Sequence, residues 1–370
     1  MSVQAADRWQ DLFARAPDDR AVSRLSLRVV RRGGQPFLLL PLAGPLAARA
    51  LALYPAQSAK ARVARKLLEL ALRLGISPLR ERAELNVAAN EPFAKFLAEC
   101  AGASELPALA ILPGNPHAPG RRFVVLVFDA RGRPVAVIKA GTTEAARQLV
   151  TREADLLAAV PAGTPGLPQP KATFKAHGLQ AFALNFIAGN SPSLDDTQPL
   201  TGLFSAWLAK HRRVNLCDLE SWRLLRAASA SAPLPAALDR AGELNLHPTL
   251  AHGDFAPWNI KVADGQWTVL DWERGQQEGI PGWDWIHFVV QSAILVRHEN
   301  TAALLARLER TLGSPEFSNY ARHAGFGGHE RLLALAYLAF AARVTRQTEG
   351  LAEIKKLEQA AAGHWFSTGC

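Results

Sequence analysis

The apolar positions of the first ninety residues predict a mixed segment of strand and helix. Residues 27–42 alternate around the pair Gly33 and Gly34, which is typical of a β-hairpin. Over residues 59–74, apolar residues recur every three or four positions, the spacing of an amphipathic helix, and Gly75 ends the pattern. The recurring residues are Val63, Leu67, Leu70 and Leu74.

After Pro107 the apolar runs become shorter and alternate with turn residues. Three strands are predicted between residues 108 and 141, the first two joined by a Pro/Gly-rich loop, Pro113 to Gly120. A helix and two further strands follow, at 143–160, 171–177 and 180–187. The rest of the chain has helical spacing, except for a hairpin around Asp264 and Gly265. The pattern predicts an α+β protein with a small antiparallel sheet followed by a mainly helical region.

Length and composition favour a globular protein with two lobes. The chain has 370 residues, of which 49% are hydrophobic and 20% charged. The first residues lack the basic start and apolar core of a signal peptide, and Pro41, Gly44 and Arg49 interrupt the longest apolar stretch. We therefore expect a cytoplasmic protein with no membrane partner.

The net charge of +9 is distributed unevenly along the chain. Residues 1–120 contain 16 Lys and Arg against 10 Asp and Glu, whereas residues 271–370 contain 10 against 11. A basic surplus can serve nucleic acid, a membrane surface or an anionic ligand. Because no nucleic-acid reading module is recognisable, a solvated basic face is the preferred interpretation, with no nucleic-acid partner.

Two charged residues stand where the pattern predicts burial. In PVAVIKAG, Lys139 lies on the strand face shared with Val135 and Val137, and Glu153 falls within the apolar stripe of the 143–160 helix. A carboxylate that faces a core is costly unless it is paired. We predict that Lys139 and Glu153 form an ion pair; a purely structural salt bridge is the alternative.

The segment LAHGDFAPWNI, residues 250–260, gathers three polar residues: His252, Asp254 and Asn259. If Asp264 and Gly265 form a two-residue turn, Asn259 lies opposite Leu270, one step from Asp271. Strict alternation would place those two side chains on opposite faces, so the ladder must loosen at this end. An oxygen-rich site of this kind suits Mg²⁺, and the alternative is a set of turn-capping residues.

Taken together, these residues resemble a family. The strand lysine in VAVIK, the helix glutamate fourteen residues later, HGDFAPWN and LDWE follow the order of the protein-kinase signatures. The HGD form and the short interval to LDWE are similar to the aminoglycoside phosphotransferase and choline/homoserine kinase-like family. The resemblance covers about residues 105–345. It implies a bilobal protein-kinase-like fold, with an accessory segment at 1–95, a small lobe at 96–188 and a helical lobe at 189–370.

The resemblance also implies roles for single residues. Asp254 would be the catalytic residue that accepts the proton of the substrate hydroxyl, with His252 bracing its loop. Asn259 and Asp271 would hold Mg²⁺ on the phosphates of ATP. Lys139 would bind the α- and β-phosphates, and Glu153 would fix Lys139. In PGWDWIHF, Asp284 would bond the backbone of the catalytic loop.

Two nucleotide contacts depend on weaker matches. FALNFIAGNSP is similar to the strand-to-hinge segment of the family, so Asn185 and Ile187 would offer backbone groups to the adenine, with Gly189 turning the chain. An ordinary buried strand ending at Gly189 is equally compatible. By the same resemblance the loop from Pro113 to Gly120 would lie over the phosphates, but it lacks the GxGxxG pattern.

The function expected from these residues is ATP- and Mg²⁺-dependent transfer of a phosphoryl group to a hydroxyl of a small molecule, preferably a sugar or sugar derivative. Trp258 and the tryptophans of DWERGQQEGIPGWDW offer faces to sugar rings, unless they belong to the core. A protein kinase and a non-catalytic nucleotide-binding module are the alternatives. An aminoglycoside kinase is disfavoured because few carboxylates are left to receive a polycation.

Overall fold

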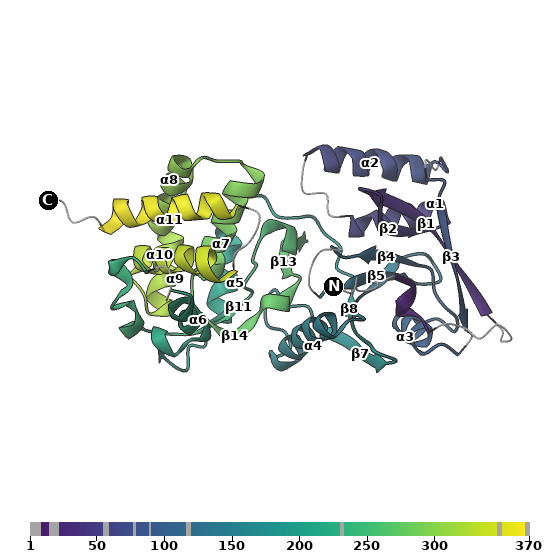
Figure 1. The fold of residues 1–370 in the computed structure, drawn as a ribbon, viewed down its shortest axis with the longest axis horizontal. Coiled ribbons are helices and arrows are strands. Elements are labelled where there is room, and N and C mark those ends of the chain that lie inside the picture. Colours follow the sequence, from purple (N-terminus) through teal and green to yellow (C-terminus); the bar gives the residue numbers. More distant parts are fainter. Residues whose placement is uncertain are drawn as a thin grey trace, which may run out of the picture. The chain divides into compact units, whose positions relative to one another are not determined.

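The computed structural model describes residues 9–14, 22–54, 59–76, 79–88, 90–115, 120–229, 233–345 and 350–366. The chain divides into two compact units. The first comprises Met1–Ala159 and Pro168–Ile187, and the second comprises Val160–Leu167 and Ala188–Cys370. The predicted α+β class is confirmed, since the first unit is built on an antiparallel sheet and the second is mainly helical (Figure 1).

An eight-stranded sheet forms the first unit, with the order β3-β1-β2-β4-β5-β6-β8-β7. Neighbouring strands pair antiparallel. In chain order the strands are β1 Val22–Arg32, β2 Gln35–Pro41, β3 Arg82–Ala88, β4 Leu109–Pro113, β5 Phe123–Phe128, β6 Pro134–Gly141, β7 Pro170–Ala176 and β8 Leu179–Asn185. The helices are α1 Gly44–Ala50, α2 Ala59–Arg73, α3 Pro92–Ala101 and α4 Glu144–Ala159, with short 3-10 helices η1 Trp9–Leu12 and η2 Leu51–Leu53. The strands and helices predicted from residue 108 to 187 are confirmed.

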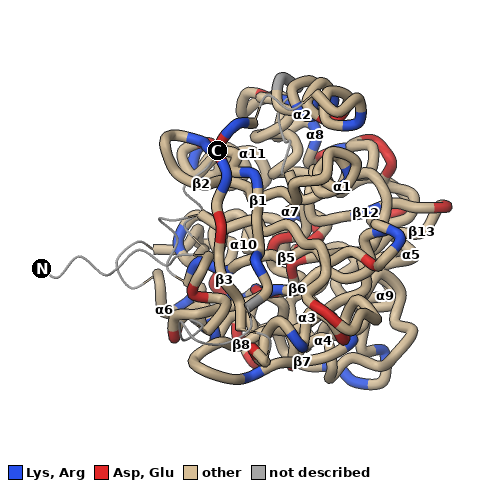
Figure 2. Tube along the Cα trace, turned by 90° about the vertical axis from the view of Figure 1, so that its right-hand side faces the viewer, with Lys and Arg blue, Asp and Glu red and all other residues tan. Residues whose placement is uncertain are grey.

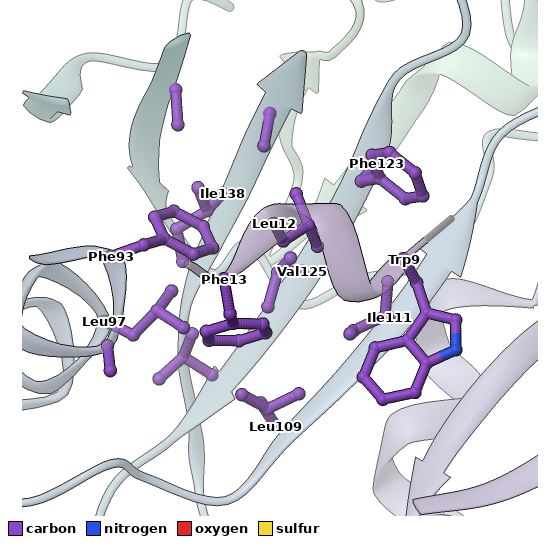
Figure 3. Packing of buried hydrophobic residues seen from close by; sticks show 14 of the residues in the cluster. Trp9, Leu12, Phe13, Phe93, Leu97, Leu109, Ile111, Phe123, Val125 and Ile138 are labelled. Atoms are coloured by element: carbon purple, nitrogen blue, oxygen red, sulfur yellow. The ribbon is translucent and has the colours of Figure 1, made fainter. Parts of the chain in front are cut away.

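The central strands of this sheet are buried on both faces, and successive residues of a strand point to opposite sides. In β2, Leu39 belongs to one hydrophobic cluster, whereas Leu38 and Leu40 belong to the other. The first cluster is covered by α3 and η1, whose apolar side chains pack on the strands (Figure 3). The second is covered by α1 and residues of α2. The central strands are therefore apolar on both faces, which makes any charge there conspicuous.

The strands of the first ninety residues belong to the same sheet as those after residue 108. Strand β2 pairs with β4, with Leu39 opposite Ile111. The hairpin of β1 and β2 turns at Gly33 and Gly34 as the alternation predicts. Figure 2 marks the Lys and Arg residues of this region in blue. The N-terminal basic surplus therefore lies on an integral part of the first unit.

The second unit consists of helices around three two-stranded ladders. Its longer helices are α5 Gln198–Trp207, α6 Glu220–Ala228, α7 Trp283–Gln291, α8 Thr301–Leu312, α9 Pro315–Ala324, α10 Glu330–Phe340 and α11 Leu351–Phe366. The ladder strands are β9 Val214–Asn215, β10 Asn245–Leu246, β11 Thr249–Ala251, β12 Ile260–Ala263, β13 Gln266–Val269 and β14 Gln276–Gly279. Single-turn 3-10 helices are η3 Leu216–Asp218, η4 Ala236–Leu238, η5 Ala241–Glu243, η6 Pro257–Asn259 and η7 Trp272–Arg274. Two π-helical segments, η8 Ser292–Val296 and η9 Ala341–Thr345, extend α7 and α10.

Within the part of the chain that the structure describes, no helix has both the length and the apolar character needed to cross a bilayer.

Candidate active site

The ion pair predicted between strand and helix is present in the first unit. Lys139 Nζ lies 2.6 Å from Glu153 Oε1 and 2.8 Å from Oε2. Strand β6 carries Lys139, which lies opposite Phe182 of β8, and α4 carries Glu153. The glutamate side chain is fully buried and that of the lysine is 11% exposed. The carboxylate therefore holds the ammonium group in one place against an otherwise apolar sheet face.

The two residues predicted to meet the adenine lie at and just after the C-terminal end of β8. Asn185 is the last residue of β8 and pairs with Ala136 of β6. Phe186 N donates to Val135 O at 3.0 Å, and the first unit ends at Ile187. Of the loop from Pro113 to Gly120, residues 116–119 lie outside the described residues, so its predicted place over the phosphates stays a prediction.

The loop that follows β11 is held by a carboxylate from α7. Asp284 accepts from the backbone N–H of His252 at 2.6 Å through Oδ2 and from that of Gly253 at 2.9 Å through Oδ1. The predicted bond from Asp284 to the loop backbone is thereby confirmed. Gly253 has φ +76°, and an added Cβ would lie 2.8 Å from the carbonyl oxygen of Arg274. Only glycine fits this turn without strain.

His252 is fully buried and links the loop to the hairpin strand. The backbone N–H of Asp254 donates to His252 Nδ1 at 3.2 Å, so Nδ1 is the acceptor. Nε2 therefore carries the proton and donates to the carbonyl of Leu270 at 2.8 Å. The ring of Trp272 packs edge-on against the imidazole at 4.8 Å between centroids. His252 thus connects the backbone of the loop to the residue that precedes Asp271.

The hairpin of β12 and β13 has the predicted register, with Ile260 opposite Val269. Beyond the hairpin, Leu270 N donates to Asn259 O at 2.7 Å. Asp271 follows Leu270 directly and is therefore close to Asn259 along the backbone. Asp271 adopts a left-handed conformation, with φ +69°. This conformation breaks the strand alternation after Leu270, as the sequence required. Such backbone strain in a non-glycine residue is often found at functional sites.

Asn259 presents its amide oxygen to the site. Its Nδ2 donates to Asp254 O at 2.8 Å and to Asp254 Oδ2 at 3.2 Å. With both bonds made by the nitrogen, Oδ1 is the atom available to a cation. That oxygen and the carboxylate of Asp271 are hard donors, which fits Mg²⁺ completed by phosphate oxygens. Among the described residues, no group of three His, Cys, Asp or Glu side chains is arranged to hold a metal ion.

Sequence reasoning missed a second histidine beside Asp254. His287 of α7 lies with Nε2 3.2 Å from Asp254 Oδ1, and its Nδ1 lies 2.9 Å from the hydroxyl of Tyr337 in α10. Both side chains are buried. An ionised carboxylate can only accept, so Nε2 carries the proton of the bond to Asp254. The signal was the segment PGWDWIHF, where His287 stands three residues after Asp284 and thus on the same helix face.

The carboxylate of Asp254 is stabilised in its ionised form. Burial by itself would raise its pKa, but the hydrogen bond from His287, together with the charge of nearby Arg274, outweighs burial. The pKa therefore lies below its ordinary value. In contrast, burial first and then the charge of Asp254 raise the pKa of Tyr337 well above its ordinary value, so this phenol stays protonated. One side of Asp254 is therefore held by a chain of hydrogen bonds that runs from Tyr337 through His287.

The tryptophans after the hairpin belong to the core and offer no faces to a ligand. Trp272, Trp283 and Trp285 are 0%, 8% and 1% exposed. The expectation that they stack on sugar rings is therefore wrong, because the rings pack against aromatic residues of α5, α9 and α10. Trp258, beside Asp254 in the loop, is half-buried and keeps a partly accessible ring.

The predicted site residues form two groups. Lys139, Glu153, Asn185 and Ile187 all lie in the first unit. His252, Asp254, Asn259 and Asp271 lie within twenty residues of one another in the second unit. The hydrogen bonds described above join His252, Asp254 and Asn259 directly, and Asp271 follows from the hairpin register.

Comparison with known proteins gives matches only at the level of solved structures. No family model and no curated protein matches this chain. An aminoglycoside phosphotransferase, APH(4)-Ia, solved as a thermostable mutant with AMP-PNP and hygromycin B, is 16% identical, with 74% of this chain and 99% of that chain covered and a TM-score of 0.45.

Two further matches act on other small molecules. A putative fructosamine-3-kinase from Haemophilus somnus 129PT is 13% identical over 72% of this chain and 96% of that chain, with a TM-score of 0.44. A macrolide 2'-phosphotransferase from Brachybacterium faecium is 16% identical over 71% and 93%, with a TM-score of 0.39. The three are small-molecule phosphotransferases, the class that the motifs resemble. At these identities and TM-scores, they assign no role to any residue.

Proposed function

We propose that this protein is an ATP- and Mg²⁺-dependent phosphotransferase that acts on a hydroxyl of a small molecule. The observation that carries the proposal is the way Asp254 is held. His287 bonds its Oδ1, Asn259 bonds its Oδ2, and its lowered pKa keeps it ionised near neutral pH. A fixed, ionised carboxylate next to a magnesium-type donor set suits a group that orients an acceptor hydroxyl.

The residues of the second unit would perform the transfer as follows. The acceptor oxygen attacks the γ-phosphorus, the bond from that phosphorus to the β-phosphate oxygen breaks, and Asp254 accepts the hydroxyl proton. Asn259 and Asp271 would hold Mg²⁺, which supplies positive charge against the phosphate oxygens. His252 and Asp284 keep the loop in place and touch no reacting atom.

The residues of the first unit would bind the nucleotide. Lys139 would contact the α- and β-phosphates, oriented by its two hydrogen bonds to Glu153. The backbone at Asn185 and Ile187 would meet the adenine. A buried glutamate fits this role, because it fixes the position of the lysine ammonium group from inside the unit.

A neutral or anionic acceptor fits the carboxylates near the site better than a polycation does. Glu278 is paired with Arg212 at 2.5 Å, and Asp284 is committed to the loop backbone. Few carboxylates of this segment therefore remain to receive several ammonium groups. A sugar or sugar derivative remains the preferred class, although only Trp258 keeps the ring exposure that suggested it. The short interval between Asp271 and Asp284 leaves little room for the activation segment of a protein kinase.

The test is a panel of hydroxyl metabolites screened for Mg²⁺-dependent release of ADP, with the products identified by mass spectrometry. Asp254→Asn is expected to lower kcat by about 100- to 10,000-fold, the usual contribution of a positioned base. Its affinity for Mg-ATP should stay within a few-fold. Asp264→Asn is the matched control, because Asp264 is an exposed turn residue of the neighbouring hairpin whose left-handed conformation Asn tolerates.

Turnover by Asp254→Asn at close to the native rate would show that another group performs the chemistry. Nucleotide binding without turnover on any hydroxyl compound would favour a non-catalytic module. Phosphorylation of protein substrates alone would favour a protein kinase, and a kcat/KM for aminoglycosides far above that for sugars would favour a resistance enzyme.

A further inference from the structure

Helix α2 carries an apolar stripe that the first unit leaves in water. Five large apolar side chains on the helix and its C-terminal turn are more than half exposed: Val63 58%, Leu67 63%, Leu70 56%, Leu74 67% and Ile76 62%. The first four follow helical spacing and therefore form one ridge. A continuous exposed ridge of this size is unusual unless a partner covers it.

The opposite side of α2 is fixed to the unit. Leu72 is fully buried in the second hydrophobic cluster, and Leu68 packs against that cluster. Gly44 at the start of α1 lets the two helices approach closely, since a Cβ there would lie 2.5 Å from Leu72 O. The helix is therefore anchored by one face, and its ridge points away from the core that holds it. Figure 1 shows α2 along the outer edge of the first unit.

Basic side chains run beside the apolar ridge. Arg62, Lys66 and Arg73 are exposed and lie, by helical spacing, in a row next to it. Glu69 forms an ion pair with Arg73 and is the single acidic residue of the helix. The available half of α2 is thus an apolar ridge with a net positive border.

The apolar ridge and its basic border together indicate which kind of partner could cover α2. A symmetric contact with a second copy would bring two basic rows together, which costs repulsion. Nucleic acid would satisfy the basic row but leave the leucines in water. An anionic lipid surface satisfies both, because its headgroups attract the basic row while its acyl boundary accepts the apolar ridge.

We propose that α2 docks the protein peripherally on an anionic membrane surface, lying in the plane of the headgroups. This is a contact and not a span, and it revises the expectation of no membrane partner. The position of the ridge in the first unit would bring the chain to the membrane without using any residue of the candidate active site.

The test uses the full chain and sedimentation with vesicles of phosphatidylcholine, alone or mixed with phosphatidylglycerol. We expect binding to the mixed vesicles that weakens as salt is raised, and little binding to phosphatidylcholine alone. Leu67→Glu combined with Leu70→Glu should reduce the partition coefficient between mixed vesicles and water by about tenfold or more. Arg62→Glu combined with Lys66→Glu should reduce it by a similar factor. Leu224→Glu, at a site 42% exposed on α6, is the matched control and should bind like the native chain.

Thermal melting should be unchanged in all these variants, because each altered side chain is exposed. Equal binding of the leucine variant and the native chain to mixed vesicles would overturn the proposal. So would equal binding to both vesicle types, or a monomer–dimer equilibrium that the leucine variant abolishes in the absence of vesicle binding. Binding to polyglutamate but not to vesicles would assign the surface to an acidic protein instead.

Discussion

The two units hold their polar groups by different means. In the first, a lysine and a glutamate meet each other inside a hydrophobic layer, one from a strand and one from a helix. In the second, the polar side chains of the loop are held by a carboxylate and a histidine that α7 brings from thirty residues away. The first arrangement is a buried ion pair between two elements of one sheet layer. The second is a network, whose members each have several partners.

This difference predicts different consequences of mutation. Removal of one member of a buried pair leaves a charge in a low-dielectric layer, and stability falls. Removal of one member of the network leaves the loop tied by the others, so activity should fall with less loss of stability. The four predictions below test that contrast, from the largest expected effect to the smallest.

Replacement of Asp271 by asparagine should lower kcat/KM by about 100-fold or more, because it removes the charge expected to bind Mg²⁺. Asparagine tolerates the left-handed conformation of this residue, so melting should change little. Asp271→Ala should lose the same activity and also stability, by about 1 to 2 kcal/mol, since alanine does not tolerate it. Kinetics at varied Mg²⁺ and thermal melting would separate the two effects. Native activity in Asp271→Asn would contradict the metal assignment.

Replacement of Lys139 by methionine should cost about 3 to 5 kcal/mol of unfolding free energy, because the buried carboxylate of Glu153 loses its lysine. The double variant Lys139→Met with Glu153→Leu should regain most of that stability, since it removes both charges from the layer. Both the single and the double variant should bind ATP more weakly than the native chain. Denaturant unfolding and calorimetry with nucleotide would show this. A stable double variant with native ATP affinity would leave the pair a purely structural role.

Replacement of His287 by phenylalanine should move the acidic limb of the kcat/KM profile to higher pH. In the native chain, the pKa of Asp254 is lowered despite burial, with His287 as the main opposing cause. Without the histidine, burial dominates and the pKa rises. Because the folded pKa lies below the unfolded one, the ionised carboxylate contributes stability at neutral pH that is lost as the pH falls through the folded pKa. In the variant the folded pKa is no longer held down, so this contribution should already be reduced at neutral pH.

His287→Gln is the matched control, because its amide keeps an N–H donor for Asp254. It should retain most of the native pH profile. An unchanged acidic limb in the phenylalanine variant, with the fold intact, would exclude His287 as a positioning residue.

Replacement of Tyr337 by phenylalanine should have the smallest effect, about 1 kcal/mol of stability, the usual value of one hydrogen bond. The hydroxyl is bonded to Nδ1 of His287, so it acts on Asp254 through the imidazole. Turnover should therefore fall only slightly, and the acidic limb should move less than in His287→Phe. A loss of activity equal to that of His287→Phe would show that the phenol is required to orient the imidazole.

The sequence predicted best what depends on neighbouring residues. The register of the hairpin with Ile260 opposite Val269, the turn at Gly33, and helix α4 all follow from local spacing and turn chemistry. The ion pair of Lys139 and Glu153 was also predictable, because each residue breaks an otherwise regular apolar pattern.

What escaped prediction depends on distant segments. The pairing of β2 with β4 joins residues separated by three α-helices, a 3-10 helix and a strand, and no periodicity encodes it. His287 and Tyr337 stand in apolar helices, where a polar residue gives no sign of its partner. The ridge of α2 was correctly predicted as helical, but spacing alone does not say whether an apolar stripe is covered.

The first unit is interrupted in the chain, and this has a consequence for the order of events during synthesis. When β6 is synthesised, its neighbour β5 is already present, but its other neighbour, β8, follows only after the segment Val160–Leu167, which belongs to the second unit. That segment is hydrogen-bonded to residues synthesised still later: Val269 N donates to Gly166 O at 2.8 Å, and Trp207 Nε1 donates to Pro165 O at 2.9 Å. A nascent chain that stops at residue 160 therefore carries Lys139 on an open sheet edge, and a chaperone that shields such edges would meet it at that length.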